Sequence, residues 1–432
     1  MLKNKTIANA GWIIACKIIQ SILGVIISML TARYLGPFDF GLINFAASVV
    51  AFVTPITTLG LNNVIVQELV YFPESEGKIL GTSMVMSLFS SVLCICGVIT
   101  FSILSSPNDT DAIIVCSLYS LLLLAQAFEI VQYWFQSKLL SKYASIVSLI
   151  AYFIVSVYKI FLLVTNKNIY WFAVSNAIDH LIIGITLLII CRKKCKQRFV
   201  FDFSCAKELF RKSKFFIVSN MMVTIFAQMD KIMLKFMIGE EATGFYSAAY
   251  ACAGMTSFVF AAIVDSMRPT IIESKKRNDS SYKEKMCILY VIVICMALAQ
   301  SLLMTLGASP IISILYGSEY EASIPVLRLI VWYTTFSYIG AVRNVWMLAE
   351  EKQRYLWIIN LAGALLNVVL NVILISLWDV KGAAIATVIT QMFTNFVICF
   401  VIKPLRPANM LMIKSMNPKF IIHTIKHIKK SF

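Results

Sequence analysis

Twelve apolar stretches divide this chain of 432 residues, and its lysines and arginines gather in every second gap between them. Each stretch is close to the roughly 20 residues that a helix needs to cross about 30 Å of hydrocarbon. The cation-rich gaps and the two ends together hold 29 of the 38 lysines and arginines, whereas the alternate gaps hold only Arg33, Lys167 and Lys381. Loops rich in Lys and Arg stay in the cytoplasm. The pattern predicts an all-α polytopic protein of the bacterial inner membrane with both termini in the cytoplasm. The stretches span residues 11–32, 43–66, 80–104, 112–135, 144–164, 169–191, 215–238, 246–265, 286–306, 326–349, 355–377 and 382–402.

Composition agrees with this class and excludes others. The chain is 59% hydrophobic, well above a soluble domain, and its formal net charge of +16 is explained by the cytoplasmic loops. No basic groove with interleaved aromatic residues is present, so we expect no nucleic acid among the partners. The first stretch is too long for a signal peptide and lacks a cleavage site of small residues, which indicates a retained helix.

Cysteine and histidine do not form a convincing metal site. Most of the eleven cysteines lie within apolar stretches, where they are expected to be buried as small hydrophobic residues. Cys191, Cys195 and Cys205 lack a fourth ligand nearby, and His423 and His427 are a lone pair in the basic tail. We therefore expect neither a metal nor a cofactor.

Two glycine pairs indicate an internal repeat. Gly36 and Gly41 recur as Gly239 and Gly244, both at an offset of 203 residues. Three polar positions match at the same offset, namely Lys17 with Asn220, Ser21 with Thr224 and Ser28 with Lys231. Since each half contains an even number of helices, the halves form a parallel repeat about an axis along the membrane normal. We expect a six-helix bundle over 1–191, a cytoplasmic linker over 192–214, a second six-helix bundle over 215–403 and a basic cytoplasmic tail over 404–432.

Two segments outside the apolar stretches have amphipathic character. Residues 204–214 of the linker could form a short helix on the membrane face, with Leu209 and Phe210 entering the lipid. In the tail, apolar residues recur at helical spacing opposite lysines over 421–432. A basic amphipathic helix there would suit an anionic leaflet, and a frayed charged tail explains the same pattern equally well.

Ionisable residues inside the apolar stretches are the main candidates for function. Each costs about 3 kcal/mol at the bilayer centre, so each should face protein or water. Polar stripes on helices of both halves suggest a central cavity between two bundles, and the excess of intramembrane cations over acids favours an anionic substrate. The residues expected to line this cavity are Lys17, Lys159, Lys231 and Arg343. The acids are Glu129, Asp179 and Asp230, and each could instead neutralise a buried lysine.

Two segments resemble a known family. RYLGPFDFGLINF (33–45) is similar to the first external loop of O-antigen flippases of the Wzx type, in the multidrug/oligosaccharidyl-lipid/polysaccharide exporter superfamily, and QMDKIMLKFMIG (228–239) is similar to the matching segment of the second half. The resemblance implies a transporter that moves a polyprenyl-diphosphate-linked oligosaccharide between leaflets by alternating access, through a cationic lumen between two bundles. It also implies membrane lipids, and a polysaccharide polymerase and chain-length regulator, as partners.

The motif residues carry over as pattern positions without individual roles. They are Arg33, Gly36, Pro37, Gly41, Asp230 and Lys231. Gly36-Pro37 is also a turn signal, which should end the first helix, and Gly239 and Gly244 should do the same after the seventh. A structural role for these glycines is therefore expected.

Two other functions fit the composition. A drug exporter of the same superfamily would commonly use acidic lumen groups, whereas the first stretch here carries Lys17 and no acid. A membrane-bound polymerase or transferase would need a catalytic cluster or a large external loop, and the sequence shows neither a nucleophile–histidine–acid set nor a phosphate-binding loop. Without a nucleotide-binding loop, transport should be driven by an ion gradient through Asp179, Asp230 or Glu129, with Asp179 as the first candidate.

The charge pattern predicts the orientation of each loop. Reporter fusions after Leu104 and Leu306 should report an external location, and fusions after Gln136 and Lys194 an internal one, because cations are retained on the cytoplasmic side. Paired phosphatase and fluorescent reporters would measure this. A reversed signal at any one of the four positions would contradict the helix count.

Overall fold

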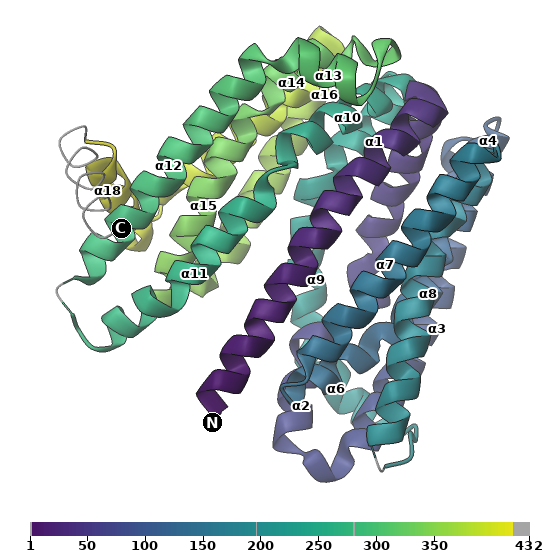
Figure 1. Ribbon diagram of the computed structural model, residues 1–432, viewed down its shortest axis with the longest axis vertical. Coiled ribbons are helices and arrows are strands. Elements are labelled where there is room, and N and C mark those ends of the chain that lie inside the picture. The colour runs from purple at the N-terminus through teal and green to yellow at the C-terminus, as the bar shows by residue number, and fades with distance from the viewer. Residues whose placement is uncertain (1, 196, 280, 418–432) are drawn as a thin grey trace. The chain divides into compact units, whose positions relative to one another are not determined.

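A computed structural model describes residues 2–195, 197–279 and 281–417, and these residues form helices and turns without a β-strand (Figure 1). The chain divides by its internal contacts into unit 1, which ends at Lys235, and unit 2, which begins at Phe236. The prediction of an all-α fold is confirmed. The basic amphipathic segment expected over 421–432, with His423 and His427, lies outside the described residues.

The helices of unit 1 pack as a bundle in which α1 contacts α7, α7 contacts α8, and α8 contacts α5. The helices are α1 (Leu2–Thr57), α2 (Ile65–Tyr71), α3 (Glu76–Ser105), α4 (Thr110–Ser120), α5 (Leu122–Phe128), the 3₁₀-helix η3 (Glu129–Val131), α6 (Gln132–Ser137), α7 (Ser141–Val164), α8 (Ile169–Lys194) and α9 (Phe203–Met237).

In unit 2, α12 packs against α15, and α10 packs against α14. The helices are α10 (Glu240–Gly254), α11 (Ser257–Lys276), α12 (Tyr282–Leu306), α13 (Ala308–Leu315), α14 (Ser323–Ile330), α15 (Trp332–Ala349), α16 (Leu356–Met392), the π-helix η6 (Phe393–Val397), α17 (Ile398–Val401) and α18 (Arg406–Ser415).

Ten helical segments in the described residues are long and apolar enough to cross a membrane. Two of them contain a break that separates two crossing lengths. In α1 the break is Gly36, whose φ is 72°, and in α16 it falls at Trp378 and Asp379. The ten segments therefore contain twelve apolar stretches, in agreement with the number that the sequence predicts.

The backbone angles at Gly36 and Gly239 explain why these two positions hold glycine. Gly36 has φ 72° and Gly239 has φ 136°, a region that residues with a Cβ rarely adopt. The two positions are related by the 203-residue offset, so the repeat in sequence is also a repeat of backbone geometry. Gly41 and Gly244 lie inside α1 and α10 instead, so the expectation that Gly244 ends a helix is wrong.

Unit 1 has two separate apolar cores. The first, which we call the outer core, includes Phe45 of α1, Val98 of α3, Leu123 of α5 and Ala177 of α8. The second, the inner core, includes Leu80 of α3, Ile130, Phe135 and Ile183, together with Leu209 of α9. On α8 the two cores are separated by the segment between Ala177 and Ile183, which carries Asp179 and His180.

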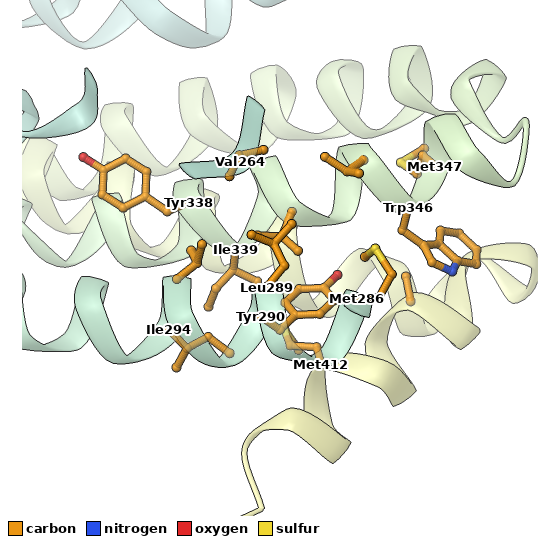
Figure 2. Close-up of a cluster of buried hydrophobic side chains, with 14 of the residues drawn as sticks. Val264, Met286, Leu289, Tyr290, Ile294, Tyr338, Ile339, Trp346, Met347 and Met412 are labelled. Atoms are coloured by element: carbon orange, nitrogen blue, oxygen red, sulfur yellow. The ribbon is translucent and has the colours of Figure 1, made fainter. Parts of the chain in front are cut away.

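Unit 2 has a continuous core built around α12 and α15. Figure 2 shows Leu289 and Tyr290 of α12 with Ile339 and Trp346 of α15, and Met412 of α18 at the edge of the same cluster. Among the aromatic contacts, Phe260 and Tyr338 are stacked with ring centroids 3.8 Å apart. Burial of such large side chains stabilises helix packing through dense van der Waals contact.

The linker that precedes α9 lies against the start of α3. Gly77 N donates to Gln197 Oε1 at 2.9 Å, and Asp202 N donates to Thr82 Oγ1 at 3.1 Å. A Cβ at Gly77 would overlap the Arg198 carbonyl oxygen, and one at Gly81 would stand 2.6 Å from the backbone nitrogen of Val200. Residues four apart share a helix face, so these two glycines form one groove for the linker backbone.

Asp202 joins this linker to both neighbouring helices. Its Oδ1 accepts a hydrogen bond from the backbone nitrogen of Cys205 at 2.7 Å, and its Oδ2 is 3.0 Å from Lys78 Nζ. The Cys205 N–H and then the Lys78 ammonium hold the pKa of the Asp202 carboxyl below its ordinary value. The carboxylate therefore stays ionised at the N-terminus of α9, where negative charge is favourable.

Residues 204–214 do not form a separate helix on the membrane surface. They are the first turns of the continuous helix α9, and Leu209 is 1% exposed within the inner core. Lys212 Nζ lies 2.9 Å from Glu68 Oε1. Leu209 packs on protein because α2 and α3 already offer an apolar surface there, and Phe210 remains exposed.

Gly77→Ala should displace the linker, because the added methyl group overlaps the Arg198 carbonyl oxygen. Overpacking of this kind costs about 1–3 kcal/mol. We expect faster tryptic cleavage after Arg198 and a lower Tm in the purified, detergent-solubilised protein. Gly97→Ala on the same helix is the control, since its Cβ would meet nothing within 4 Å. Equal cleavage of the two variants would contradict the close packing.

Candidate functional site

A group of polar residues lies inside unit 1, at and between the two apolar cores. We call it the polar cluster, and it comprises Gln126, Glu129, Lys159, Asn176, Asp179 and His180. On α5 and η3, the segment between Leu123 of the outer core and Ile130 of the inner core provides Gln126 and Glu129. Because hydrocarbon cannot hydrate these groups, they must be satisfied by one another or by enclosed water.

The closest pair in the polar cluster joins α8 to η3. His180 Nδ1 lies 2.9 Å from Glu129 Oε1, and the side chains are 30% and 15% exposed, respectively. When Glu129 is ionised it can only accept hydrogen bonds, and the imidazole then donates from Nδ1 and leaves Nε2 for a further proton. This bond connects two spans that are 51 residues apart in sequence.

Asp179 and Lys159 form the other half of the cluster. Lys159 Nζ on α7 donates to Asn176 Oδ1 on α8 at 3.3 Å, and Asn176 also hydrogen-bonds with Tyr119 of α4. Asp179 is attracted by Lys159 and His180, but its Oδ1 is buried and accepts no hydrogen bond from the described residues. The cluster therefore contains one carboxylate oxygen whose hydrogen-bonding capacity is unused.

A pocket of about 170 Å³ opens beside Glu129. Its polar lining is Thr54, Thr58, Asn62, Gln126, Glu129 and Gln132, and Tyr133 adds an aromatic ring. Gln126 Oε1 is a second buried oxygen without a hydrogen-bond partner among the described residues. A space of this size with several polar partners can hold water. Gln126, Glu129 and Gln132, all from the apolar stretch at 112–135, line this pocket.

The structure places the four predicted cavity cations in different surroundings. Lys17 is exposed on α1, Lys159 belongs to the polar cluster, and Lys231 is partly buried on α9. Arg343 is in unit 2 and only 4% exposed. Unit 1 thus brings Lys159 together with the predicted coupling residues Asp179 and Glu129.

Arg343 makes its contacts with the protein itself. Nη1 donates to the Thr394 carbonyl oxygen at 2.7 Å, and Nη2 donates to Asn344 Oδ1 at 3.0 Å. Thr394 lies in the π-helix η6, where the wider turn alters the regular backbone bonding. Arg343 Nε is buried with no hydrogen-bond partner among the described residues.

Helix α9 is joined to the rest of unit 1 by separate side-chain contacts near its start, in its second half and near its end. Gln228 Oε1 accepts from Ser48 at 3.1 Å, and Lys235 Nζ lies 2.9 Å from Asp109 Oδ2. Asp109 Oδ1 also caps α4 by accepting a hydrogen bond from Ala112 N. Asp230, the third predicted coupling acid, is 4% exposed on this helix. Its neighbour in sequence is Lys231, and it is not a member of the polar cluster.

The motif residues of the first half lie around the break within α1. Arg33 is exposed, and Gly36 and Pro37 form the break described above. Nearby, Tyr34 donates a hydrogen bond to the Lys167 carbonyl oxygen at 3.0 Å. These contacts give the motif a structural role in joining α1 to the turn before α8.

The candidate residues predicted from the sequence do not include His180, Asn176 or Tyr152. Tyr152 lies within electrostatic reach of Asp179, and its hydroxyl would be 2.9 Å from a Cβ at Gly24. The available signal was the spacing of Asn176, Asp179 and His180, which places three polar residues on one face of an apolar helix.

Known proteins share both the sequence and this fold. The polysaccharide biosynthesis protein family matches residues 6–275, more than half of the chain. The chain belongs to this family. The family resemblance noted from residues 33–45 and 228–239 is thereby confirmed, as is the assignment to a multi-pass membrane protein.

Individual relatives are distant. An Escherichia coli K12 protein assigned as an O-antigen transporter is 22% identical over 385 residues, which cover 85% of this chain and 90% of that protein. The Haloferax volcanii protein Agl15, assigned as a low-salt glycan biosynthesis flippase, is 22% identical over 197 residues. That alignment covers 44% of this chain and 40% of Agl15, so it spans less than half of the relative.

The fold is similar to that of a solved lipid II flippase, MurJ, in an inward closed conformation. The TM-score is 0.74 at 13% sequence identity, and the match covers 97% of this chain and 92% of MurJ. A multidrug resistance transporter of the same superfamily in an inward-facing conformation gives a TM-score of 0.66 at 13% identity. The exporter fold predicted from the resemblance is confirmed.

Proposed function

We propose that this protein is a flippase that moves a polyprenyl-diphosphate-linked oligosaccharide of a polysaccharide pathway from the cytoplasmic to the periplasmic leaflet. The observation that carries the proposal is its relationship to the E. coli protein assigned as an O-antigen transporter, which extends over 85% of this chain. The family match and the exporter fold support the same function. No step of this function changes a covalent bond, so the protein acts as a transporter and not as an enzyme.

The location and partners follow from this function. The protein resides in the inner membrane with both termini in the cytoplasm, which the distribution of its cations supports. Two six-helix halves, related by the 203-residue repeat, alternate access to the two leaflets. A polysaccharide polymerase and a chain-length regulator receive the product at the outer leaflet.

Deletion of the gene tests the flippase directly. A complete lipid-linked repeat unit should accumulate on the cytoplasmic side, because its synthesis continues while its translocation stops. Mass spectrometry of extracted lipids measures the intermediate, and complementation with the intact gene should remove it. Loss of the intermediate, in place of its accumulation, would indicate a biosynthetic enzyme and overturn the proposal.

Positively charged side chains bind the diphosphate. Lys17, Lys159, Lys231 and Arg343 are the candidates, and removal of a charge-assisted contact to phosphate weakens binding by about 1.5–3 kcal/mol. Lys231→Ala and Arg343→Ala should therefore abolish surface polysaccharide, and Arg343→Lys should retain part of it because the charge remains.

Exposed cations provide matched controls for this prediction. Lys381 and Arg328 are both exposed, so Lys381→Ala and Arg328→Ala should export normally. Surface polysaccharide is measured by gel electrophoresis of cell envelopes, with protein levels checked by immunoblot. Normal export from both Lys231→Ala and Arg343→Ala would refute the binding role.

An ion gradient drives transport through the buried acids Asp179, Asp230 or Glu129. Movement of one charge across the membrane supplies about 2.3 kcal/mol per 100 mV, enough to bias a conformational cycle. In proteoliposomes, collapse of both proton and sodium gradients should slow translocation, and Asp179→Asn should remove the dependence on them. Glu319→Gln, at an exposed position in unit 2, is the control. Translocation at the full rate without a gradient would contradict ion coupling.

A further inference from the structure

The pair of His180 and Glu129 differs from the other ionised contacts of unit 1. The Lys212–Glu68 and Lys78–Asp202 pairs lie at the ends of helices, whereas His180 and Glu129 lie within membrane-spanning helices between two apolar cores. The chain contains three histidines, and the other two, His423 and His427, belong to the tail outside the described residues. Among the residues that the structure describes, His180 is therefore the one histidine.

The charge balance of the polar cluster depends on this imidazole. When all three are ionised, Asp179 and Glu129 provide two negative charges and Lys159 provides one positive charge. With a protonated His180 the cluster is neutral, and with a neutral His180 it carries one excess negative charge inside hydrocarbon. Histidine is the side chain whose ordinary pKa lies between pH 5 and 8, so it can change its charge under physiological conditions.

The groups that face the pair come from every helix packed around α8. Asp179 is its neighbour on α8, Lys159 and Tyr152 approach from α7, and Tyr133 of α6 lies within electrostatic reach of Glu129. Tyr119 of α4 is linked to the cluster through Asn176, α5 contributes the neutral Gln126, and α1 contributes Thr54 to the pocket. Two carboxylates thus flank the imidazole, with one lysine to offset them.

A route for protons is available beside the pair. The 170 Å³ pocket reaches Glu129 and is lined by hydroxyl and amide groups that can hold water. Gln126, which lines the pocket, and Asp179 of the polar cluster each have a buried oxygen, Oε1 and Oδ1 respectively, whose hydrogen-bonding capacity no described residue uses. Water in this pocket can therefore connect Glu129 to its surroundings through hydrogen bonds.

We propose that the His180–Glu129 pair is the site at which this transporter takes up and releases a proton, an inference that rests on the proposed ion-driven flippase function. His180 Nδ1–H donates to Glu129, so the incoming proton adds to the Nε2 lone pair and forms an imidazolium. Departure of the same proton to the opposite side restores the neutral ring. One proton is bound and one released per cycle, and no other reactant is consumed.

A proton suits this site better than a sodium ion. Glu129 is the carboxylate among the residues that line the pocket, and one of its oxygens already accepts from His180. The pocket offers oxygen atoms, but a sodium ion there would be repelled by an imidazolium whose Nδ1 lies 2.9 Å from the same carboxylate. A proton can instead add to His180 and leave again while the hydrogen bond between His180 and Glu129 is kept.

Titration of His180 tests the site without any transport assay. His423→Gln with His427→Gln leaves a full-length protein with a single histidine, so its imidazole can be followed by ¹⁵N NMR after specific labelling. We expect a single titration of this imidazole within the pH range over which the protein stays folded. Glu129→Gln should move its midpoint by about one pH unit or more, and Glu319→Gln should leave it unchanged. An imidazole that does not titrate, or that ignores Glu129→Gln, would overturn the proposal.

Transport in proteoliposomes tests whether this proton is the coupled one. The single-histidine protein should flip the lipid-linked oligosaccharide faster when a proton gradient is imposed, and His180→Gln should lose that stimulation. Stimulation by a sodium gradient alone, or retained proton stimulation in His180→Gln, would overturn the assignment. A protein that binds no lipid-linked substrate and flips none would refute the flippase function, while the NMR titration would still decide whether the pair exchanges a proton.

Discussion

The cost of an ionised group in hydrocarbon determines how unit 1 is built. Glu129, Asp179, Lys159 and His180 lie within helices that are otherwise apolar, and the bundle holds them together between two apolar cores. Each would be unfavourable alone, because burial of a charge is tolerated only with a partner. The bond from His180 to Glu129 and the contacts of Lys159 therefore constrain how α5, η3, α7 and α8 can pack.

Such an arrangement is only marginally favourable for stability, and this is a reason to connect it with function. Buried ion pairs often contribute less than apolar residues of the same size, since desolvation offsets their attraction. The pocket beside Glu129 and the unpaired Asp179 oxygen leave the cluster incompletely satisfied. A group that must gain and lose a charge during transport needs this kind of balance between burial and access.

Helix α9 shows that a repeat in sequence and a unit in space need not share a boundary. The 203-residue repeat assigns α9 to the second half, beginning at 215. Its contacts lie in unit 1, through Lys212 with Glu68 near its start, Gln228 with Ser48, and Lys235 with Asp109 near its end. The contact boundary falls next to Gly239, where the backbone adopts φ 136°. The repeat shows which helix of the first half α9 corresponds to, whereas its side-chain contacts show that it packs against unit 1.

The sequence alone was sufficient to predict the helical class, the number of crossing stretches and the family, because these depend on local properties. Segment length and hydropathy respond to bilayer thickness, cations report the cytoplasmic side, and Gly36 and Gly239 mark positions where only glycine fits the backbone easily. The role of Asp109 as a helix cap was also local, and so could be predicted from the residues around it.

Only the tertiary structure decided which polar residues meet. Helical periodicity placed Glu129 on one polar face and Asp179 on another helix, but the partner of Glu129 proved to be His180, 51 residues further along the chain. Likewise, an amphipathic pattern could not tell a lipid-facing Leu209 from one buried against α2 and α3, and the contacts of Arg343 with a π-helix had no signal in its own neighbourhood. Pairing across helices depends on their packing and rotation, which one-dimensional periodicity does not specify.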